Sequence, residues 1–184
     1  MRIIAGKWRG RALKTPRGDA TRPTADRTRE ALFSMLASRL GSFDGLAVAD
    51  MFAGTGALGL EALSRGAARA IFVEQDKEAV AVLRANIAAL GAEGEVIPTG
   101  VASLGAARRP CDLLLFDPPY GSGGAGALLE RLTRLGWAAP GAWASIETAR
   151  DETVSAAGWT LDAERIHGKA KLSVLALTPA APPG

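Results

Sequence analysis

The chain has 184 residues, 48% of them hydrophobic, and a formal net charge of +3, which is enough for one good-sized core. One cysteine and one histidine exclude a disulfide within the chain and leave too few side chains for the usual zinc site, so we expect no metal. No stretch approaches membrane-spanning length, and the N-terminal arginines are not followed by an apolar leader. We therefore expect a cytoplasmic monomer without a membrane partner.

Basic residues are concentrated at the start of the chain. Residues 1–29 carry nine Lys and Arg against Asp19 and Asp26, whereas the remainder is mildly acidic. Such a basic arm favours a polyanionic partner, and its alternation with apolar residues predicts a small β-hairpin with one basic face. The residues expected to contact this partner are Arg2, Lys7, Trp8, Arg9, Arg11, Lys14, Arg22, Thr24, Arg27 and Arg29. We expect an arm over 1–24, a catalytic domain over 25–178 and a disordered tail over 179–184.

Helix-like and strand-like stretches alternate after the arm. Thr24 is expected to cap a helix from Ala25 to about Leu40, and Asp76 to cap another that Gly91 ends. A further helix runs from Gly56 to near Gly66, and another covers Leu128 to Leu135. The expected strands are Leu46–Asp50, Ala70–Glu74, Glu95–Pro98, Cys111–Phe116, Ala142–Ile146, Leu161–Ile166 and Leu172–Leu177. This order predicts a doubly wound α/β fold, mostly parallel, with an antiparallel last strand.

A glycine turn follows the first expected strand. Gly54, Gly56 and Gly59 match the dinucleotide fingerprint between a strand and a helix, and Glu74 lies where a carboxylate accepts ribose hydroxyls. A dinucleotide and S-adenosylmethionine both fit this pattern. Asp50 favours S-adenosylmethionine, because a carboxylate attracts its ammonium and repels a pyrophosphate. The expected cofactor residues are Asp50, Phe52, Ala53, Gly54, Thr55, Gly56, Gly59, Glu74, Gln75, Gly100, Val101, Ser103 and Asp117.

The tetrapeptide Asp117-Pro118-Pro119-Tyr120 follows a buried strand, at the sheet edge where ligands bind in open α/β folds. The two prolines favour extended backbone, so that the Asp117 carboxylate and the Pro118 carbonyl face one small volume and can hold the hydrogens of a planar amine. Tyr120 can stack on the ring that carries this amine. We therefore assign Asp117, Pro118, Pro119 and Tyr120 to catalysis of methyl transfer.

These motifs, together with Met1-Arg2-Ile3-Ile4-Ala5-Gly6-Lys7-Trp8-Arg9-Gly10, Arg22-Pro23-Thr24, Arg29-Glu30-Ala31-Leu32-Phe33 and Ala139-Pro140-Gly141, resemble the RsmD family along nearly the entire chain. The resemblance implies a Rossmann-like, seven-stranded S-adenosylmethionine-dependent methyltransferase fold. It also implies methylation of the N2 amine of guanine 966 in the 16S rRNA of the small ribosomal subunit.

Two positions depart from the family pattern. Thr99-Gly100-Val101 replaces an expected acid near the adenine, so backbone atoms or Ser103 would hold that ring, and His167-Gly168 replaces a Tyr-Gly pair. Four alternatives stay open. They are a DNA adenine-N6 methyltransferase, a protein glutamine methyltransferase, an NAD-dependent oxidoreductase and a non-catalytic RNA-binding assembly factor.

Overall fold

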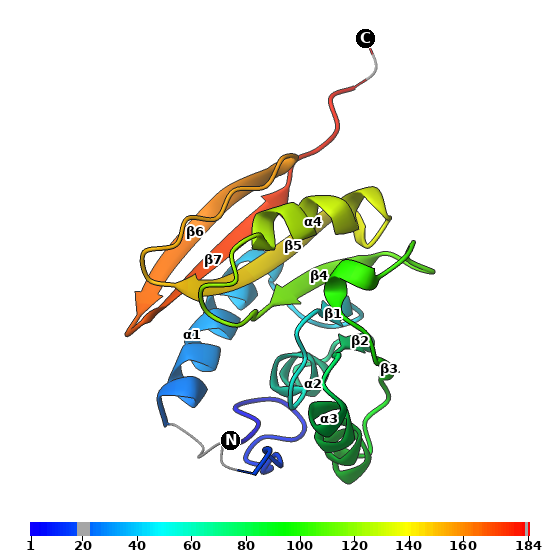
Figure 1. Ribbon diagram of the computed structural model, residues 1–184, viewed down its shortest axis with the longest axis vertical. Helices are drawn as coiled ribbons and strands as arrows, with labels where there is room; N and C mark the ends of the chain where they lie inside the picture. Colours follow the sequence, from blue (N-terminus) through cyan, green and yellow to red (C-terminus); the bar gives the residue numbers. More distant parts are fainter. Residues whose placement is uncertain (18–22, 183) are drawn as a thin grey trace. The chain divides into compact units, whose positions relative to one another are not determined.

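The structure, a computed structural model, describes residues 1–17, 23–182 and 184. The chain forms two compact units, residues 1–104 and 105–184, whose elements are labelled in Figure 1. Its seven strands form a mixed sheet, as expected. Within the described part of the chain, no helix is both long and apolar enough to cross a membrane. The expected bounds of the arm, the catalytic domain and the tail remain predictions.

The first unit has a parallel sheet with the strand order β3-β2-β1. Its elements are α1 (Pro23–Leu40), β1 (Ala47–Asp50), α2 (Ala57–Ser64), β2 (Arg69–Val73), α3 (Lys77–Leu90), β3 (Glu95–Ile97) and the 3-10 helix η1 (Val101–Ser103). Helix α2 packs against β1 and β2. All four residues of β1 are buried, as expected for a parallel strand covered on both faces.

The ends of α3 confirm two expected caps. Asp76 accepts a hydrogen bond from the Ala79 N–H at 2.8 Å, and Gly91 ends the helix with a φ of 62°. The expected Thr24 cap of α1 is wrong, because the helix already begins at Pro23. Proline suits a first helical position, since its φ is already helical and no partner is needed for an N–H there.

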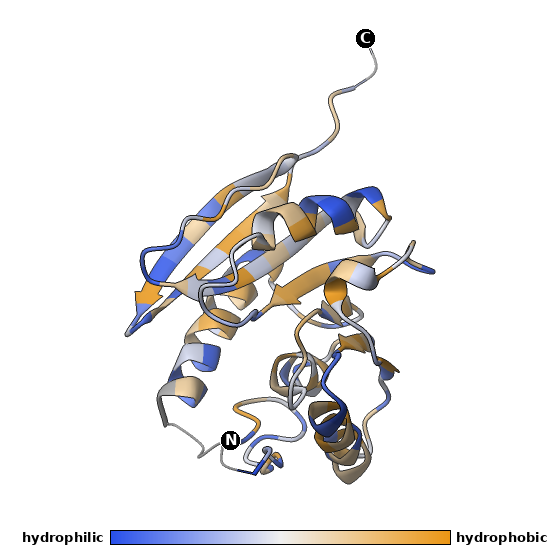
Figure 2. Cartoon of the chain, in the orientation of Figure 1, coloured by the Kyte–Doolittle hydropathy of each residue, from blue (hydrophilic) through white to orange (hydrophobic). Residues whose placement is uncertain are grey.

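The second unit has the strand order β4-β5-β7-β6. Its elements are β4 (Cys111–Phe116), α4 (Ala125–Arg134), β5 (Ala138–Ala149), β6 (Trp159–His167) and β7 (Ala170–Leu177). Strands β4 and β5 are parallel, and β7 runs antiparallel to both β5 and β6, which confirms the antiparallel last strand. Figure 2 shows β4 as hydrophobic along its length and β6 as far more hydrophilic, consistent with a buried strand and an exposed one.

Strand β5 is longer than expected, since it begins at Ala138 and not at Ala142. The added part contains Pro140, although proline normally argues against a strand interior. The pairing between β4 and β5 shifts register between Cys111↔Ala138 and Leu113↔Trp143. The irregularity accommodates Pro140 and Gly141, whose φ is 75°. The strand also continues past its expected end at Ile146 to Ala149, so it carries Glu147.

Candidate active site

The glycine turn connects β1 to α2 in the first unit, and its three glycines are required for separate reasons. Gly54 and Gly56 have φ angles of 52° and 86°, a region that side chains other than glycine rarely adopt. Gly59 instead lies inside α2 against Phe72, where an added Cβ would come within 2.4 Å of the ring. The first two glycines therefore shape the turn, and the third lets α2 lie close to β2.

Asp50 lies at the end of β1 and is fully buried. Its Oδ2 accepts a hydrogen bond from the Gly59 N–H at 2.9 Å, whereas Oδ1 has no hydrogen-bond partner within the described residues. Burial raises the pKa of Asp50 from 3.8 to about 7, against the lowering effect of the Gly59 N–H, and Glu74 adds a smaller raising effect. A ligand ammonium would satisfy Oδ1 and favour the ionised carboxylate. Asp50 thus fits the cationic end of S-adenosylmethionine.

Glu74 directly follows β2, and its carboxylate connects the end of this strand to the glycine turn and to the start of α3. Its Oε2 accepts a hydrogen bond from the Gly54 N–H at 2.8 Å, and its Oε1 accepts one from the Asp76 N–H at 2.8 Å. Each carboxylate oxygen has a second lone pair, so both can still accept a hydroxyl hydrogen. Glu74 therefore holds the turn against the start of α3 and keeps the acceptors that two ribose hydroxyls require.

The other residues predicted to bind the cofactor include several near β2 and η1. A Cβ on Gly100 would meet the Gln75 Oε1 at 2.7 Å, so these two residues are in close contact. Val101 is buried and Ser103 is exposed, while Ala53 is buried and donates its N–H to the Val73 carbonyl at 3.0 Å. Phe52 is half-buried. The assignment of Ser103 or backbone atoms to an adenine remains a prediction.

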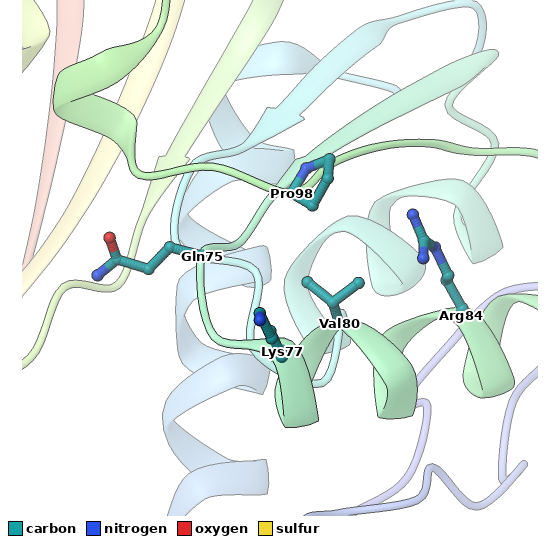
Figure 3. A pocket seen from close by; sticks show the side chains of 5 residues that line it. All are labelled: Gln75, Lys77, Val80, Arg84 and Pro98. Atoms are coloured by element: carbon teal, nitrogen blue, oxygen red, sulfur yellow. The ribbon is translucent and has the colours of Figure 1, made fainter.

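A hollow of about 280 Å³ lies beside this group, lined by Gln75, Lys77, Val80, Arg84 and Pro98. Figure 3 shows Lys77, Val80 and Arg84 along one side of α3, with Pro98 across from them. Of the lining residues, Gln75 alone belongs to the predicted cofactor set. The hollow is thus lined by the apolar residues Val80 and Pro98 and by two cations, and it lies next to the chain segment that carries Glu74.

The predicted catalytic tetrapeptide lies in the second unit, immediately after buried β4. Asp117, Pro119 and Tyr120 are exposed, and Pro118 is buried. Exposed polar groups after a buried strand are accessible to a substrate, and the catalytic assignment of these residues remains a prediction. The Tyr120 hydroxyl donates a hydrogen bond to the Glu147 Oε1 at 2.8 Å.

Glu147 on β5 is a site residue that the sequence reading missed. Burial raises the pKa of its carboxyl group, although the hydrogen bond from Tyr120 acts in the opposite direction. Partial burial, the Glu147 carboxylate and, less strongly, Asp117 raise the pKa of Tyr120. The phenol therefore stays protonated and acts as a donor. An acid directly after the expected strand Ala142–Ile146 is the signal that could have identified Glu147, because a carboxylate next to a buried strand usually has a partner.

The basic N-terminal segment, residues 1–17, is closed by a single antiparallel bridge between Arg2 and Ala12 and not by the paired strands of the expected hairpin. Ile3 and Leu13 are buried, which agrees with the expected apolar face. The basic residues of this segment that are expected to meet RNA are all exposed, and they are Arg2, Lys7, Arg9, Arg11 and Lys14. Two of them also contact the protein, since the Arg11 Nη2 donates to the Ala89 carbonyl at 2.8 Å and the Arg2 Nε lies 3.8 Å from the Asp26 carboxylate. Trp8 is half-buried with the Lys7 Nζ at 4.2 Å from its ring centroid.

This segment is held against α2 by a buried carboxylate. Glu61, fully buried, accepts hydrogen bonds from the Ile4 and Ala5 N–H groups at 2.8 and 3.0 Å. The Ser64 hydroxyl donates to the Ala5 carbonyl at 2.6 Å and accepts from the Trp8 N–H at 3.0 Å. A Cβ on Gly6 would lie 1.8 Å from the Ser64 carbonyl oxygen. The segment therefore lies directly against α2, and there is no space for a side chain at Gly6.

Four predicted RNA residues lie near the start of α1. Arg27 is exposed, Arg22 lies outside the described residues, and the side chain of Thr24 does too. The structure does not support Arg29 as a phosphate ligand, because its side chain is only 5% exposed. Its Nη2 donates to Asp26 at 3.0 Å and to the Arg2 carbonyl, and its Nε lies 3.7 Å from Glu61. The anionic groups beside the Arg29 guanidinium are thus the carboxylates of Asp26 and Glu61, and no phosphate is needed to balance its charge.

Within the part of the chain that the structure describes, no group of three or more His, Cys, Asp or Glu side chains is arranged to hold a metal ion.

Comparison with known proteins identifies relatives along nearly the whole chain. A family profile described as Conserved hypothetical protein 95 matches residues 1–176. Ribosomal RNA small subunit methyltransferase D of Escherichia coli K12 is 38% identical over 173 residues, which cover 92% of this chain and 86% of the relative. The solved structure of the yhhF protein from Escherichia coli has a TM-score of 0.82 and 36% identity, covering 98% of this chain and 99% of that one. Magnesium protoporphyrin IX methyltransferase from Synechocystis, solved with bound SAM, shares the fold alone, with a TM-score of 0.67 and 16% identity over 88% of this chain and 87% of that one.

Proposed function

This chain belongs to the family described as Conserved hypothetical protein 95, the RsmD family, and from that premise we propose that it methylates the N2 amine of one guanine in small-subunit ribosomal RNA. The methyl donor in this proposal is S-adenosylmethionine, and the guanine is position 966 in the family's name. The observation that carries the proposal is an exposed Asp117-Pro118-Pro119-Tyr120 directly after buried β4, in a member of a methyltransferase family.

Asp50, Glu74 and the glycine turn form what we call the donor half-site, which has separate groups for the positive and the negative ends of a ligand. The unpartnered Asp50 Oδ1 would accept from an ammonium, and backbone N–H groups at the start of α2 would receive a carboxylate. The Glu74 oxygens would accept the ribose hydroxyls. When bound, S-adenosylmethionine supplies an electrophilic methyl group on a sulfonium, whose C–S bond breaks with its electron pair remaining on sulfur.

The residues Asp117 to Tyr120, which we call the acceptor half-site, make the amine of guanine more nucleophilic in this proposal. Its lone pair is delocalised into the guanine ring, so the nitrogen is a weak nucleophile until its hydrogens are held. The Asp117 carboxylate and the Pro118 carbonyl accept those two hydrogens and orient the lone pair. After the nitrogen has formed its bond to carbon it is cationic, and a proton leaves through Asp117 or water. Tyr120, oriented by Glu147, stacks on the base, which must be unpaired or flipped out.

The RNA contact in this proposal comes from the exposed basic side of residues 1–17. Arg9 and Arg11 would meet phosphates, which supply affinity and register and little sequence choice. The expected partner is the small ribosomal subunit or its 16S rRNA, and we propose a cytoplasmic monomer acting on it.

The test is transfer of tritiated methyl groups from S-adenosylmethionine to small ribosomal subunits from cells that lack this protein, followed by nucleoside analysis. N2-methylguanosine is the expected product. N6-methyladenine in DNA, or methylated glutamine in protein, would replace the proposal by one of the other methyltransferase alternatives. Binding of NAD without binding of S-adenosylhomocysteine would support the oxidoreductase, and cofactor binding without any methylated product would support the assembly factor.

A further inference from the structure

Asn86 on α3 joins the basic N-terminal segment to the glycine turn. Its side chain is only 2% exposed. The Oδ1 accepts a hydrogen bond from the Lys14 N–H at 2.8 Å, and the Nδ2 donates to the Lys14 carbonyl at 3.0 Å and to the Thr55 carbonyl at 2.9 Å. Both N–H donors of the amide and its acceptor oxygen are therefore engaged. They connect Lys14 to Thr55, which are 41 residues apart in the sequence.

A second contact connects the same two segments. The Thr55 hydroxyl lies 3.4 Å from the Met1 Sδ and donates a weak hydrogen bond to it. Farther along the helix that follows the turn, Glu61 holds the Ile4 and Ala5 N–H groups. The N-terminal segment is thus attached at the glycine turn through Thr55 and at the middle of α2 through Glu61.

Lys14 has separate surfaces for these contacts. Its backbone N–H and carbonyl are both used by Asn86, whereas its side chain is exposed. A phosphate can therefore approach the ammonium group while the backbone stays held. Thr55 lies between Gly54 and Gly56, two glycines with positive φ, so its carbonyl direction depends on the conformation of the turn.

We propose that Asn86 couples RNA binding by the N-terminal segment to cofactor binding at the glycine turn, an inference that rests on the proposed function. A cofactor that orders the turn fixes the Thr55 carbonyl, which orients the Asn86 amide and with it the backbone of Lys14. The segment is then held in its docked state, which is the state that presents its cations together. By reciprocity, RNA that stabilises the docked segment strengthens cofactor binding by the same factor.

The first test needs no RNA. Hydrogen exchange of the backbone amides in residues 11–17 is measured with and without S-adenosylhomocysteine, in the wild type, in Asn86→Ala and in Asn86→Asp. Added S-adenosylhomocysteine slows exchange in the wild type by about tenfold, a typical size for coupling between two sites. Neither Asn86 variant shows this added protection. The matched control is Ala81→Ser, on the exposed side of α3, which keeps the wild-type response.

Asn86→Asp keeps the volume and the acceptor for the Lys14 N–H but places an anionic oxygen against two carbonyls. It therefore serves as the deciding variant if Asn86→Ala does not fold. Equal protection by S-adenosylhomocysteine in the wild type and in a folded Asn86 variant overturns the coupling. Absence of protection in the wild type, when calorimetry shows that the compound binds, overturns it as well.

The second test measures the dissociation constant for small ribosomal subunits from cells lacking this protein, with and without saturating S-adenosylhomocysteine. The wild type binds about tenfold more tightly with the compound, whereas Asn86→Asp shows a ratio near one. Arg9→Ala weakens binding equally under both conditions and keeps the wild-type ratio. An Arg9→Ala protein with unchanged affinity would argue against the RNA-binding role of the segment, whereas an Asn86→Asp protein with the wild-type ratio would argue against the coupling alone.

Discussion

The Tyr120 hydroxyl donates a hydrogen bond to the Glu147 Oε1 at 2.8 Å, which ties the last residue of the predicted catalytic tetrapeptide to β5. The tyrosine ring is 56% exposed, so this bond and not packing sets the direction in which the ring projects. An aromatic ring that stacks on a base loses less conformational freedom on binding when it is already oriented. We therefore propose that Glu147 positions Tyr120 without touching a reacting atom.

Replacement of this acceptor should impair RNA methylation without affecting the cofactor. Glu147→Ala is expected to lower kcat/KM for the ribosomal substrate by about tenfold, as expected for a lost hydrogen bond to a charged group. Glu147→Gln keeps an acceptor oxygen and should recover most of the activity. Steady-state kinetics with S-adenosylhomocysteine titrations on both variants check this. An alanine variant as active as the wild type would show that the hydrogen bond has no role in orienting Tyr120.

Asp117, which is predicted for both catalysis and cofactor binding, is expected to act mainly in the chemical step. Asp117→Ala should lower methyl transfer by at least about a hundredfold, as for loss of a positioned acceptor, and leave S-adenosylhomocysteine affinity unchanged. Asp117→Asn keeps an acceptor without the charge, so its activity should lie between the two. Single-turnover assays and calorimetry separate these effects. Parallel loss of activity and cofactor affinity would assign Asp117 to the donor half-site or to the fold.

Asp50 should make both cofactor affinity and stability depend on pH. Since its pKa is raised from 3.8 to about 7, the ionised form that receives an ammonium becomes populated as the pH rises through 7. Affinity for S-adenosylhomocysteine should therefore increase between about pH 6 and 8. The stability of the unliganded protein should change in the opposite direction. A carboxyl group whose pKa is higher in the folded than in the unfolded state stabilises the fold at a pH below its unfolded pKa, and this stabilisation is lost as the pH rises through its folded pKa.

Asp50→Asn is the matched control for this pH dependence. Its amide oxygen can still accept the Gly59 N–H, but its NH₂ group would face the ligand ammonium. The variant should bind S-adenosylhomocysteine weakly at every pH and should lose the part of the pH dependence of the melting temperature that Asp50 causes between about pH 4 and 7. Melting curves at a series of pH values, with and without S-adenosylhomocysteine, measure both effects. The prediction is refuted if the wild type and the variant follow the same pH profile.

Gly59 should be sensitive to a single added methyl group. Gly59→Ala places a Cβ 2.4 Å from the Phe72 ring and is expected to destabilise the protein by about 1–3 kcal/mol through overpacking. Gly105→Ala, where nothing lies within 4 Å of the added Cβ, should stay within about 0.5 kcal/mol of the wild type. Urea unfolding measures the difference. Adding Phe72→Leu should restore part of the stability of Gly59→Ala, and strict additivity of the two changes would argue against this contact.

Arg9 and Arg29 should behave differently although both were predicted to contact RNA. Arg9→Ala, at an exposed position, should weaken RNA binding and reduce the slope of its salt dependence by about one. Arg29→Ala should instead cost about 3 kcal/mol of folding stability, because it leaves the buried Glu61 carboxylate with one cation fewer. RNA titrations at several salt concentrations and thermal melts distinguish the two. A reduced salt slope in a stable Arg29→Ala protein would return Arg29 to the RNA surface.

The sequence by itself determined the order of elements and the positions of the principal motifs. Asp76 and Gly91 bound their helix through capping rules that act over a few residues, and Gly54, Gly56 and Glu74 follow a spacing that one strand, one turn and one helix impose. Asp117 is likewise located by the apolar strand before it. These features are local, so composition and spacing suffice to find them. The length of β5 was missed because an irregular register, decided by its neighbour β4, accommodates Pro140 and Gly141.

Only the tertiary structure decided which polar side chains support those motifs. Glu147 reaches Tyr120 across 27 residues of sequence, Glu61 reaches Ile4 across 57, and Asn86 reaches Lys14 across 72. The same packing turned Arg29 from a predicted phosphate ligand into the buried partner of Asp26. A buried polar group must find a partner wherever the folded chain provides one, and no periodicity or spacing along the sequence records which distant residue that will be.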